Sequence, residues 1–209
     1  PIQWRGRELY MPQFAIGRLV ETPQEIDAYI DNFLLQPSIA PTNALVTGYD
    51  FLKDQAAAIQ AALQAGGITP IALVNDIWTA DDLRPYLSTL PQAYPLNSLN
   101  GHFNHFSLLP ATQNPFDLFY AHEITASLTS FTSTLVFSVG CHSGLNVPDS
   151  DTSLPENGID WAQAFMRRLA TFIGNTGFGY GDSDLIAYSE LLALNFTENL
   201  TSGGPVAIG

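Results

Sequence analysis

Short strand-like runs alternate with helix-like segments almost from end to end of this chain. Runs of aliphatic and β-branched residues at 44–48, 71–74 and 135–139 are followed by segments in which apolar residues recur at helical spacing. Alternation of this kind predicts βαβ units, in which parallel strands form one sheet with helices on both faces. We therefore expect an α/β fold, a three-layer sandwich with a largely parallel central sheet.

The length of 209 residues suits one fairly large domain, and a hydrophobic fraction of 46% predicts a packed core. A short strand is expected at Phe14–Gly17. The helix after it is opened by the capping box Thr22–Glu25, with proline at its first helical position. The start at Pro1 and the apolar end at 205–209 favour a fragment of a longer protein.

Acidic residues far outnumber basic ones, and the formal net charge is −13. Phosphate backbones and anionic lipids would repel such a domain, so we expect neither nucleic acid nor a membrane surface as a partner. A cationic substrate would be tolerated. The single cysteine cannot form an intrachain disulfide, so the location is not fixed, and an extracellular or cell-surface place within a larger protein stays open.

That cysteine, Cys141, ends a strand-like run and stands in the small, polar turn Gly140–Gly144. In an open α/β sheet the carboxyl ends of the strands form the active-site crevice. A second run, 96–101, ends in the same way at His102. A thiol and an imidazole at two such ends are the parts of a cysteine nucleophile and its base. The alternative is a small buried hydrophobic residue.

His105 follows His102 closely and is the alternative catalytic base. His102 is favoured because it comes directly after the permissive Gly101 at the strand end. Both could instead be loop imidazoles, or could bind a metal together with His122 or Glu123. No HExxH or CxxC spacing supports a metal site, so we predict neither metal nor cofactor.

A glycine-rich turn at 177–181 resembles a phosphate-binding loop only superficially. It lacks the GxGxxG spacing and the following Lys-Ser/Thr pair, so phosphate binding is not expected. Backbone flexibility beside a substrate cleft is the more natural use.

The order of these elements resembles the gingipain-type branch of the caspase-fold cysteine peptidases, which are related to metacaspases and clostripain. The resemblance rests on GH at one strand end, GCHSG at the next, and the strand and turn at 174–182. The opening at 13–25 is also similar. The resemblance implies one caspase-like peptidase domain over 1–209, with 1–43 as lead-in and 44–209 as catalytic core.

By this resemblance Cys141 is the nucleophile of a cysteine endopeptidase and His102 its general acid and base. Backbone amides near Gly101, Phe103 and Gly140 to Cys141 would hold the oxyanion. The chain departs from its relatives in two places. Phe103 follows the histidine where many relatives have glycine, and Val139 and Gly140 stand where some carry an aspartate that recognises a basic P1 residue.

Specificity must then come from elsewhere, and Asp50, at the end of the 44–48 strand, could bind a basic P1 side chain. Its alternative role is the N-cap of the helix that starts at Phe51. Aromatic residues could line the pocket or belong to the core: Trp78, Trp161 and Tyr180. Loop acids could hold calcium as in some relatives, or be solvated charges: Asp149, Asp151, Glu156, Asp182 and Asp184.

The expected partners are a peptide or protein substrate and other domains of the same polypeptide. A second possibility is an inactive caspase-like domain that binds or scaffolds within a larger bacterial protein, because a fold does not guarantee a function. A third is a hydrolase or transferase that uses the same two side chains on esters or thioesters.

Overall fold

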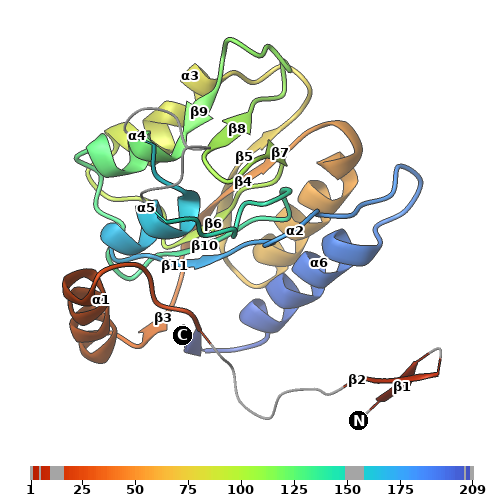
Figure 1. The fold of residues 1–209 in the computed structure, drawn as a ribbon. Coiled ribbons are helices and arrows are strands. Elements are labelled where there is room, and N and C mark those ends of the chain that lie inside the picture. Colours follow the sequence, from red (N-terminus) through yellow and green to blue (C-terminus); the bar gives the residue numbers. More distant parts are fainter. Residues whose placement is uncertain (1, 5, 10–16, 149–157, 205, 208–209) are drawn as a thin grey trace.

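The computed structural model describes residues 2–4, 6–9, 17–148, 158–204 and 206–207 (Figure 1). Most of the strand expected at Phe14–Gly17 lies outside this part of the chain, and Gly17 itself is not in a strand. The loop acids Asp149, Asp151 and Glu156 also lie outside it.

The centre of the fold is a five-stranded sheet with the order β11–β10–β6–β4–β5. Its strands are β4 (Asn43–Gly48), β5 (Thr69–Val74), β6 (Leu96–Ser98), β10 (Leu135–Phe137) and β11 (Thr171–Ile173). Every neighbouring pair is parallel. The predicted parallel central sheet is therefore confirmed.

Helices cover both faces of the sheet and make three layers (Figure 1). One face packs on α2 (Lys53–Ala65), which lies against α6 (Tyr188–Thr201). The other carries α4 (Ala121–Ala126), α5 (Trp161–Arg167) and α3 (Ala80–Arg84). Side chains alternate between the faces as strand geometry requires. Leu135 and Phe137 point to the α2 side, and Val136 points to the α5 side.

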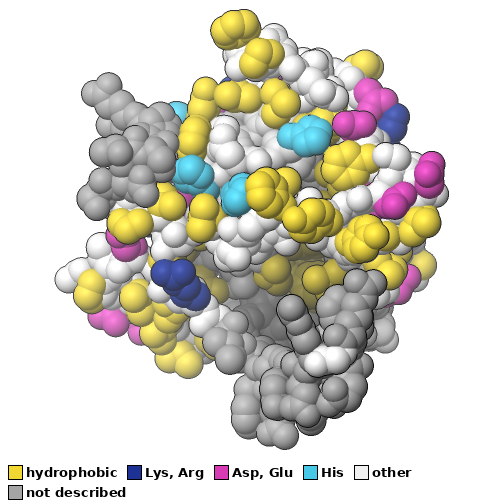
Figure 2. All heavy atoms as spheres, turned by 45° about the vertical axis from the view of Figure 1, so that its right-hand side comes forward, with side chains coloured by type: hydrophobic (Ala, Val, Ile, Leu, Met, Phe, Trp, Pro, Cys, Tyr) yellow, Lys and Arg dark blue, Asp and Glu magenta, His cyan; other side chains and the backbone are white. Residues whose placement is uncertain are grey.

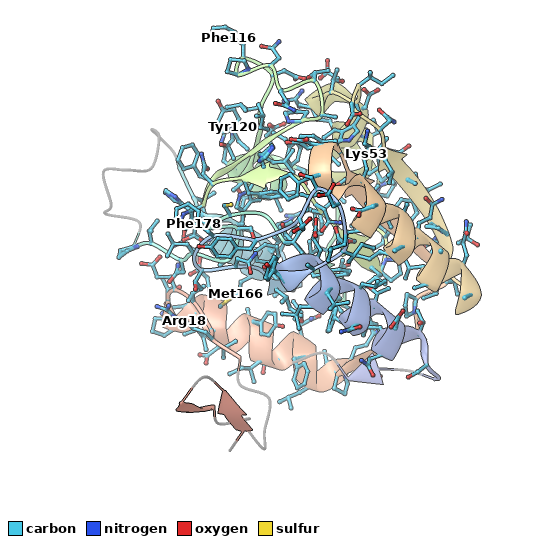
Figure 3. All side chains as sticks on the ribbon, turned by 90° about the vertical axis from the view of Figure 1, so that its right-hand side faces the viewer. Arg18, Lys53, Phe116, Tyr120, Met166 and Phe178 are labelled. Carbon is cyan, nitrogen blue, oxygen red and sulfur yellow. The ribbon has the colours of Figure 1, made fainter. Side chains whose placement is uncertain are left out.

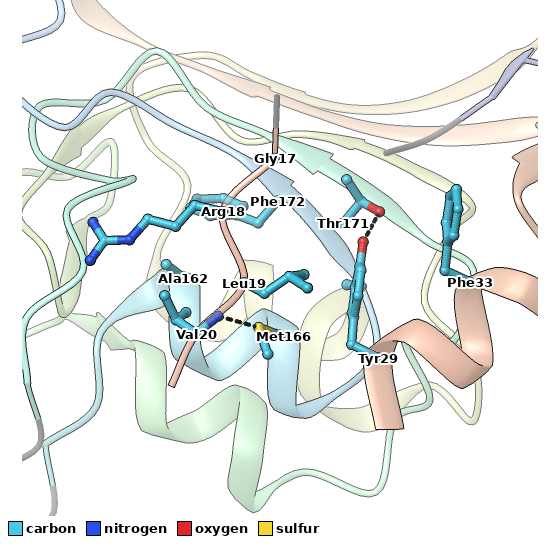
Figure 4. Close-up of a pocket in the computed structure, with 11 residues that line it drawn as sticks. Gly17, Arg18, Leu19, Val20, Tyr29, Phe33, Ala162, Met166, Thr171 and Phe172 are labelled. Carbon is cyan, nitrogen blue, oxygen red and sulfur yellow. Dashed lines mark hydrogen bonds between the residues drawn. The ribbon is translucent and has the colours of Figure 1, made fainter. Parts of the chain in front are cut away.

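The helix α1 (Pro23–Leu35) begins as the sequence predicts. Thr22 Oγ1 accepts from the Glu25 backbone, and the Glu25 carboxylate accepts from Thr22 N at 3.0 Å. The segment 17–20 and α1 enclose a cavity of about 240 Å³ against α5 and β11 (Figure 4). Tyr29 Oη lies 2.5 Å from Thr171 Oγ1 there, so the lead-in packs on the edge of the central sheet.

The stretch from Phe106 to about Thr134 shows no clear sequence period, which predicts irregular loops, yet the chain from 102 to 120 contains a second sheet. The antiparallel strands β7 (His102–Phe103), β8 (Ser107–Leu109) and β9 (Phe119–Tyr120) precede α4. Two corrections follow. His102 is not the end of β6 but begins β7, four residues beyond Ser98. The segment is also partly regular. Its strands were not predicted, because strands of two or three residues are too short to show a sequence period.

Two further segments differ from expectation. Pro85 in the weakly helical run 79–90 predicts a helix that starts near Asp82, but the helix begins at Ala80, with Thr79 as its N-cap. Pro85 opens a separate π-helical turn, Pro85–Thr89, and so breaks no bond of α3. The last strand, β12 (Val206–Ala207), pairs antiparallel with β3 (Ser38–Ile39) outside the central sheet.

Another two-stranded pair, β1 (Ile2–Trp4) with β2 (Arg7–Leu9), is antiparallel. Among the helices in the part of the chain that the structure describes, none is long and apolar enough to cross a membrane.

Candidate active site

Asp50, His102 and Cys141 follow three neighbouring strands, β4, β6 and β10. Ser98, the last residue of β6, is in register with Phe137, the last of β10. His102 and Cys141 therefore stand equally far beyond their strand ends. Histidine side chains gather on one face of the molecule, among hydrophobic ones (Figure 2). The carboxyl edge of the sheet thus brings a thiol, an imidazole and a carboxylate to one side of the fold.

A compact turn carries Cys141. Ser138 Oγ accepts from Gly140 N at 3.0 Å, and Ser143 Oγ donates to Gly140 O at 2.9 Å. His142 has a φ of 55°, a left-handed conformation that few non-glycine residues adopt, and its N–H donates to Gly177 O at 2.7 Å. The Gly140 amide is therefore already engaged, and it is not free to hold an oxyanion in this conformation.

The glycine-rich loop runs directly alongside this turn. Asn175 Nδ2 donates to Val139 O at 2.8 Å, and Gly144 N donates to Asn175 O at 2.8 Å. The Cys141 thiol donates to Gly179 O across 3.7 Å. A Cβ atom at Gly179 would lie 1.8 Å from Val139 O. Close backbone approach, rather than the expected flexibility, is what requires glycine at position 179.

His102 is held from two sides. Its backbone N–H donates to Tyr49 Oη at 3.0 Å, and that hydroxyl donates to Leu109 O at 2.5 Å. Burial raises the pKa of Tyr49 to about 12, so the hydroxyl keeps its proton. The imidazole packs edge-on against the Tyr49 ring, with centroids 5.5 Å apart. It also packs at a tilt against the Phe51 ring, with centroids 5.8 Å apart. With 41% of its side chain exposed, His102 is oriented yet open to a substrate.

His105 lies elsewhere, at the start of α5. Its carbonyl accepts from Trp161 N at 3.0 Å, and its ring packs edge-on against Phe106. Its Nε2 is buried without a hydrogen-bond partner among the described residues. The charge of His105 lowers the pKa of Asp160. The geometry thus favours His102 over His105 as the base.

Phe103 joins the two candidate catalytic residues. Its ring is only 8% exposed and packs on Trp161 with centroids 5.4 Å apart. A Cβ atom at Gly140 would lie 2.3 Å from Phe103 Cδ2. The residue after His102 thus packs against the residue before Cys141, so the two segments that carry the candidates lie side by side. Among the described residues, no hydrogen bond joins the thiol to an imidazole.

Of the other amides proposed for the oxyanion, Gly101 and Phe103 also lie beside His102. A Cβ at Gly101 would come within 2.9 Å of the Tyr49 ring, so only glycine lets the chain pass there. Phe103 pairs with Leu108 in the second sheet. Their part in holding an oxyanion stays a prediction.

Asp50 does not cap the helix, so the N-cap interpretation is wrong. It lies inside the 3₁₀ turn Asp50–Leu52, with a φ of 55°, and its side chain caps nothing. Its N–H donates to Asp76 Oδ1 at 2.9 Å, and Asp76 also pairs with Lys53. Its carboxylate Oδ2 lies 3.5 Å from His102 Nε2. In Figure 3, Lys53 at the start of α2 and Phe178 in the glycine-rich loop lie apart from each other.

The remaining candidates fall into two groups. Trp78 and Trp161 are 2% and 1% exposed and belong to the core, whereas Tyr180 is 64% exposed. His122 stacks on Tyr120, and Glu123 pairs with Arg84 at 2.8 Å. In the described ranges, no group of three or more His, Cys, Asp or Glu side chains is arranged to hold a metal ion.

The sequence interpretation missed two buried carboxylates next to the site. Asp160 is the N-cap of α5 and accepts from Val147 N at 2.8 Å and from Asn146 Nδ2 at 3.0 Å, which ties α5 to the chain after the Cys141 turn. Glu190 accepts from the backbones of Asp182 and Ala187. Asp160 directly before a helical stripe was a readable cap signal. Glu190 had no such signal.

Comparison with known proteins adds no relative: no family model, curated protein or solved structure matches this chain.

Proposed function

We propose that this domain is a cysteine endopeptidase with a caspase-like, gingipain-type fold. The observation that supports the proposal is the close packing of Phe103 on Gly140, because these residues directly follow His102 and directly precede Cys141. Their exposure agrees with such a role. Cys141 is half-buried and His102 is open to solvent, so neither is sealed in the core.

In the proposed reaction His102 removes the thiol proton, and the Cys141 sulfur attacks the scissile carbonyl carbon. The tetrahedral intermediate collapses to a thioester as the C–N bond breaks, and the imidazolium gives its proton to the leaving amine. Water then attacks the thioester with His102 as base, which frees the carboxylate and the thiol. The thiol must first leave Gly179 O to reach the imidazole.

The Asp50 carboxylate supports a further part of the proposal, a preference for a basic P1 side chain. About half of the Asp50 side chain is exposed, and it stands beside His102. The net charge of −13 would attract such a substrate over longer distances.

An inactive binding or scaffold domain is the second candidate. It is favoured by one observation, that the thiol donates to a backbone carbonyl rather than to an imidazole. The two candidates differ in the reactivity of Cys141, which can be measured directly.

The test compares four variants on a fluorogenic peptide library: Cys141→Ala, His102→Ala, His105→Ala and His122→Ala. We expect hydrolysis to vanish in the first and to fall by about 10²–10⁴-fold in the second, as loss of a general base does. His122→Ala is the control for removal of an imidazole. A peptidyl chloromethylketone should alkylate Cys141, as detected by mass spectrometry. A folded protein that neither hydrolyses peptides nor reacts supports the scaffold instead.

A further inference from the structure

An apolar cavity of about 310 Å³ lies between the carboxyl ends of β10 and β11 and the helix α6. Its hydrophobic walls are Phe137, Val139, Ile173, Leu192, Ala193 and Phe196. None of the described residues that line it carries a charge. Its volume falls at the lower end of the ~300–1,000 Å³ typical of ligand sites, which suits one large side chain rather than an extended ligand.

The wall of this cavity is continuous with the turn that carries the nucleophile. Val139 comes two residues before Cys141, and its carbonyl accepts from Asn175 Nδ2 at 2.8 Å. Ser138, Val139 and Asn175 all line the cavity. A group seated in it would therefore touch the same hydrogen-bonded unit that positions the thiol.

Exposed apolar side chains surround the cavity. Leu192 is 71% exposed and Ile173 45% exposed, and the neighbouring loop presents Phe178 and Tyr180 at 65% and 64%. Exposed apolar side chains grouped beside a cavity are typical of a binding site, because a bound apolar group removes them from water.

The strand order places this cavity and Asp50 on opposite sides of Cys141. The cavity lies between β10 and β11, whereas His102 and Asp50 follow β6 and β4 on the other side of β10. A peptide lying over the thiol would thus meet an apolar cavity on one side and a carboxylate on the other.

We propose that this cavity binds a large aliphatic or aromatic side chain of the peptide substrate, close to the scissile bond. The inference rests on the proposed peptidase function and specifies its substrate. It predicts that cleavage requires an apolar residue at one defined substrate position, separate from any basic residue recognised by Asp50.

The first test fills the cavity with Ala193→Leu, and kcat/KM is measured on peptides varied at each position. Ala193 is 7% exposed and lines the cavity, so the added atoms enter existing space. Wild-type protein should favour Leu or Phe over Ser at one position. The variant should lose at least about tenfold on the Leu and Phe peptides there, and little on an Ala peptide. Circular dichroism checks that the variant is folded.

Two neighbouring leucines of α6 supply a matched pair. Leu192 lines the cavity, whereas Leu191 does not, although it is 43% exposed on the same helix. Leu192→Ala should weaken the apolar preference, and Leu191→Ala should leave it unchanged. Hydrolysis without an apolar preference at any position, or an unchanged preference in Ala193→Leu, overturns the cavity proposal while the peptidase stands.

A binding measurement keeps the inference separable from catalysis. Cys141→Ala protein is titrated with fluorescein-labelled peptides that carry Leu, Phe or Ser at each position, and anisotropy is recorded. The Leu and Phe peptides should bind at least about tenfold more tightly at one position, and Ala193→Leu should remove that difference. If the wild type proves inactive towards peptides and chloromethylketone, the peptidase fails. Equal binding of all peptides then also overturns the cavity proposal.

Discussion

At Asp160 a carboxylate is fully buried beside the site, and its surroundings make it a titrating element of the fold. Burial raises its pKa above the ordinary 3.8, against the hydrogen bonds from Gln163, Val147 and Asn146 and the charge of His105, which lower it. The folded protein therefore holds this proton to a higher pH than the unfolded chain does. Its contribution to stability is largest below pH 3.8 and is lost as pH rises through the folded pKa.

We predict that Asp160→Asn removes this component. Asparagine can still accept at the N-cap of α5, so the helix keeps its start. From pH 4 to pH 7 the free energy of unfolding of the wild type should contain a falling term that the variant lacks. Urea unfolding at each pH measures this term. Asp27→Asn, at an exposed position of α1, controls for the loss of one charge. Parallel curves for the wild type and Asp160→Asn contradict the prediction.

Single residues were only partly predictable from the sequence. Cys141 and His102 stand out because each polar residue ends an apolar run beside glycine. The contact of Phe103 with Gly140 could not be predicted, because it joins two segments whose distance depends on the packed sheet. The pairing of the Asp50 carboxylate with His102 was missed for the same reason, since they follow different strands.

At the scale of elements, the loop from Gly174 to Gly181 determines how the Cys141 thiol is presented. Its backbone meets the Cys141 turn through Asn175, Gly177 and Gly179. Gly179 and Gly177 differ sharply in their surroundings. A Cβ at Gly179 would lie 1.8 Å from Val139 O, whereas a Cβ at Gly177 would meet nothing within 4 Å.

This contrast predicts different outcomes for the same substitution. Gly179→Ala should push the loop away from Val139, lower stability by about 1–3 kcal/mol as overpacking does, and slow alkylation of Cys141. Gly177→Ala should keep the alkylation rate, because the methyl group enters open space. Urea unfolding and the rate of chloromethylketone labelling measure the two effects. Equal loss in both variants contradicts this account of the loop.

The elements themselves were predicted with uneven success. The strands at 44–48, 71–74 and 135–137 consist largely of aliphatic and β-branched residues, which made them readable from the sequence, and all three belong to the parallel central sheet. The sheet of β7, β8 and β9 was missed, since strands of two or three residues are too short for alternation to appear.

The molecule as a whole is dominated by negative charge. Twenty Asp and Glu side chains face seven Lys and Arg, and the sequence pI is about 4.3. Several cations are already paired, among them Arg84 with Glu123 and Lys53 with Asp76. The unbalanced carboxylates repel one another, and that repulsion opposes the compact state.

Screening should therefore stabilise the fold at pH 7. Raising NaCl from 0.01 to 0.1 M shortens the Debye length from about 30 to about 10 Å, so repulsion between exposed carboxylates weakens. We expect Tm to rise by a few degrees, as measured by scanning calorimetry. The same change of salt near the pI of about 4.3 should have a smaller effect. A fall of Tm at pH 7 would mean that attractive ion pairs outweigh the repulsion.

The thiol donates to Gly179 O, while Asn175 and the Gly177 carbonyl hold the backbone of the turn around it through Val139 O and the His142 N–H. Phe178 and Tyr180 on the same loop are mostly exposed, and the Phe178 ring packs edge-on against His142. Within this one loop, some residues hold the Cys141 turn and others present exposed side chains. A change at Tyr180 therefore alters the exposed surface of the loop, whereas a change at Phe178 also removes a contact with the neighbour of Cys141. Position 180 is therefore the place in this loop where the surface can be redesigned with the least effect on the turn that carries Cys141.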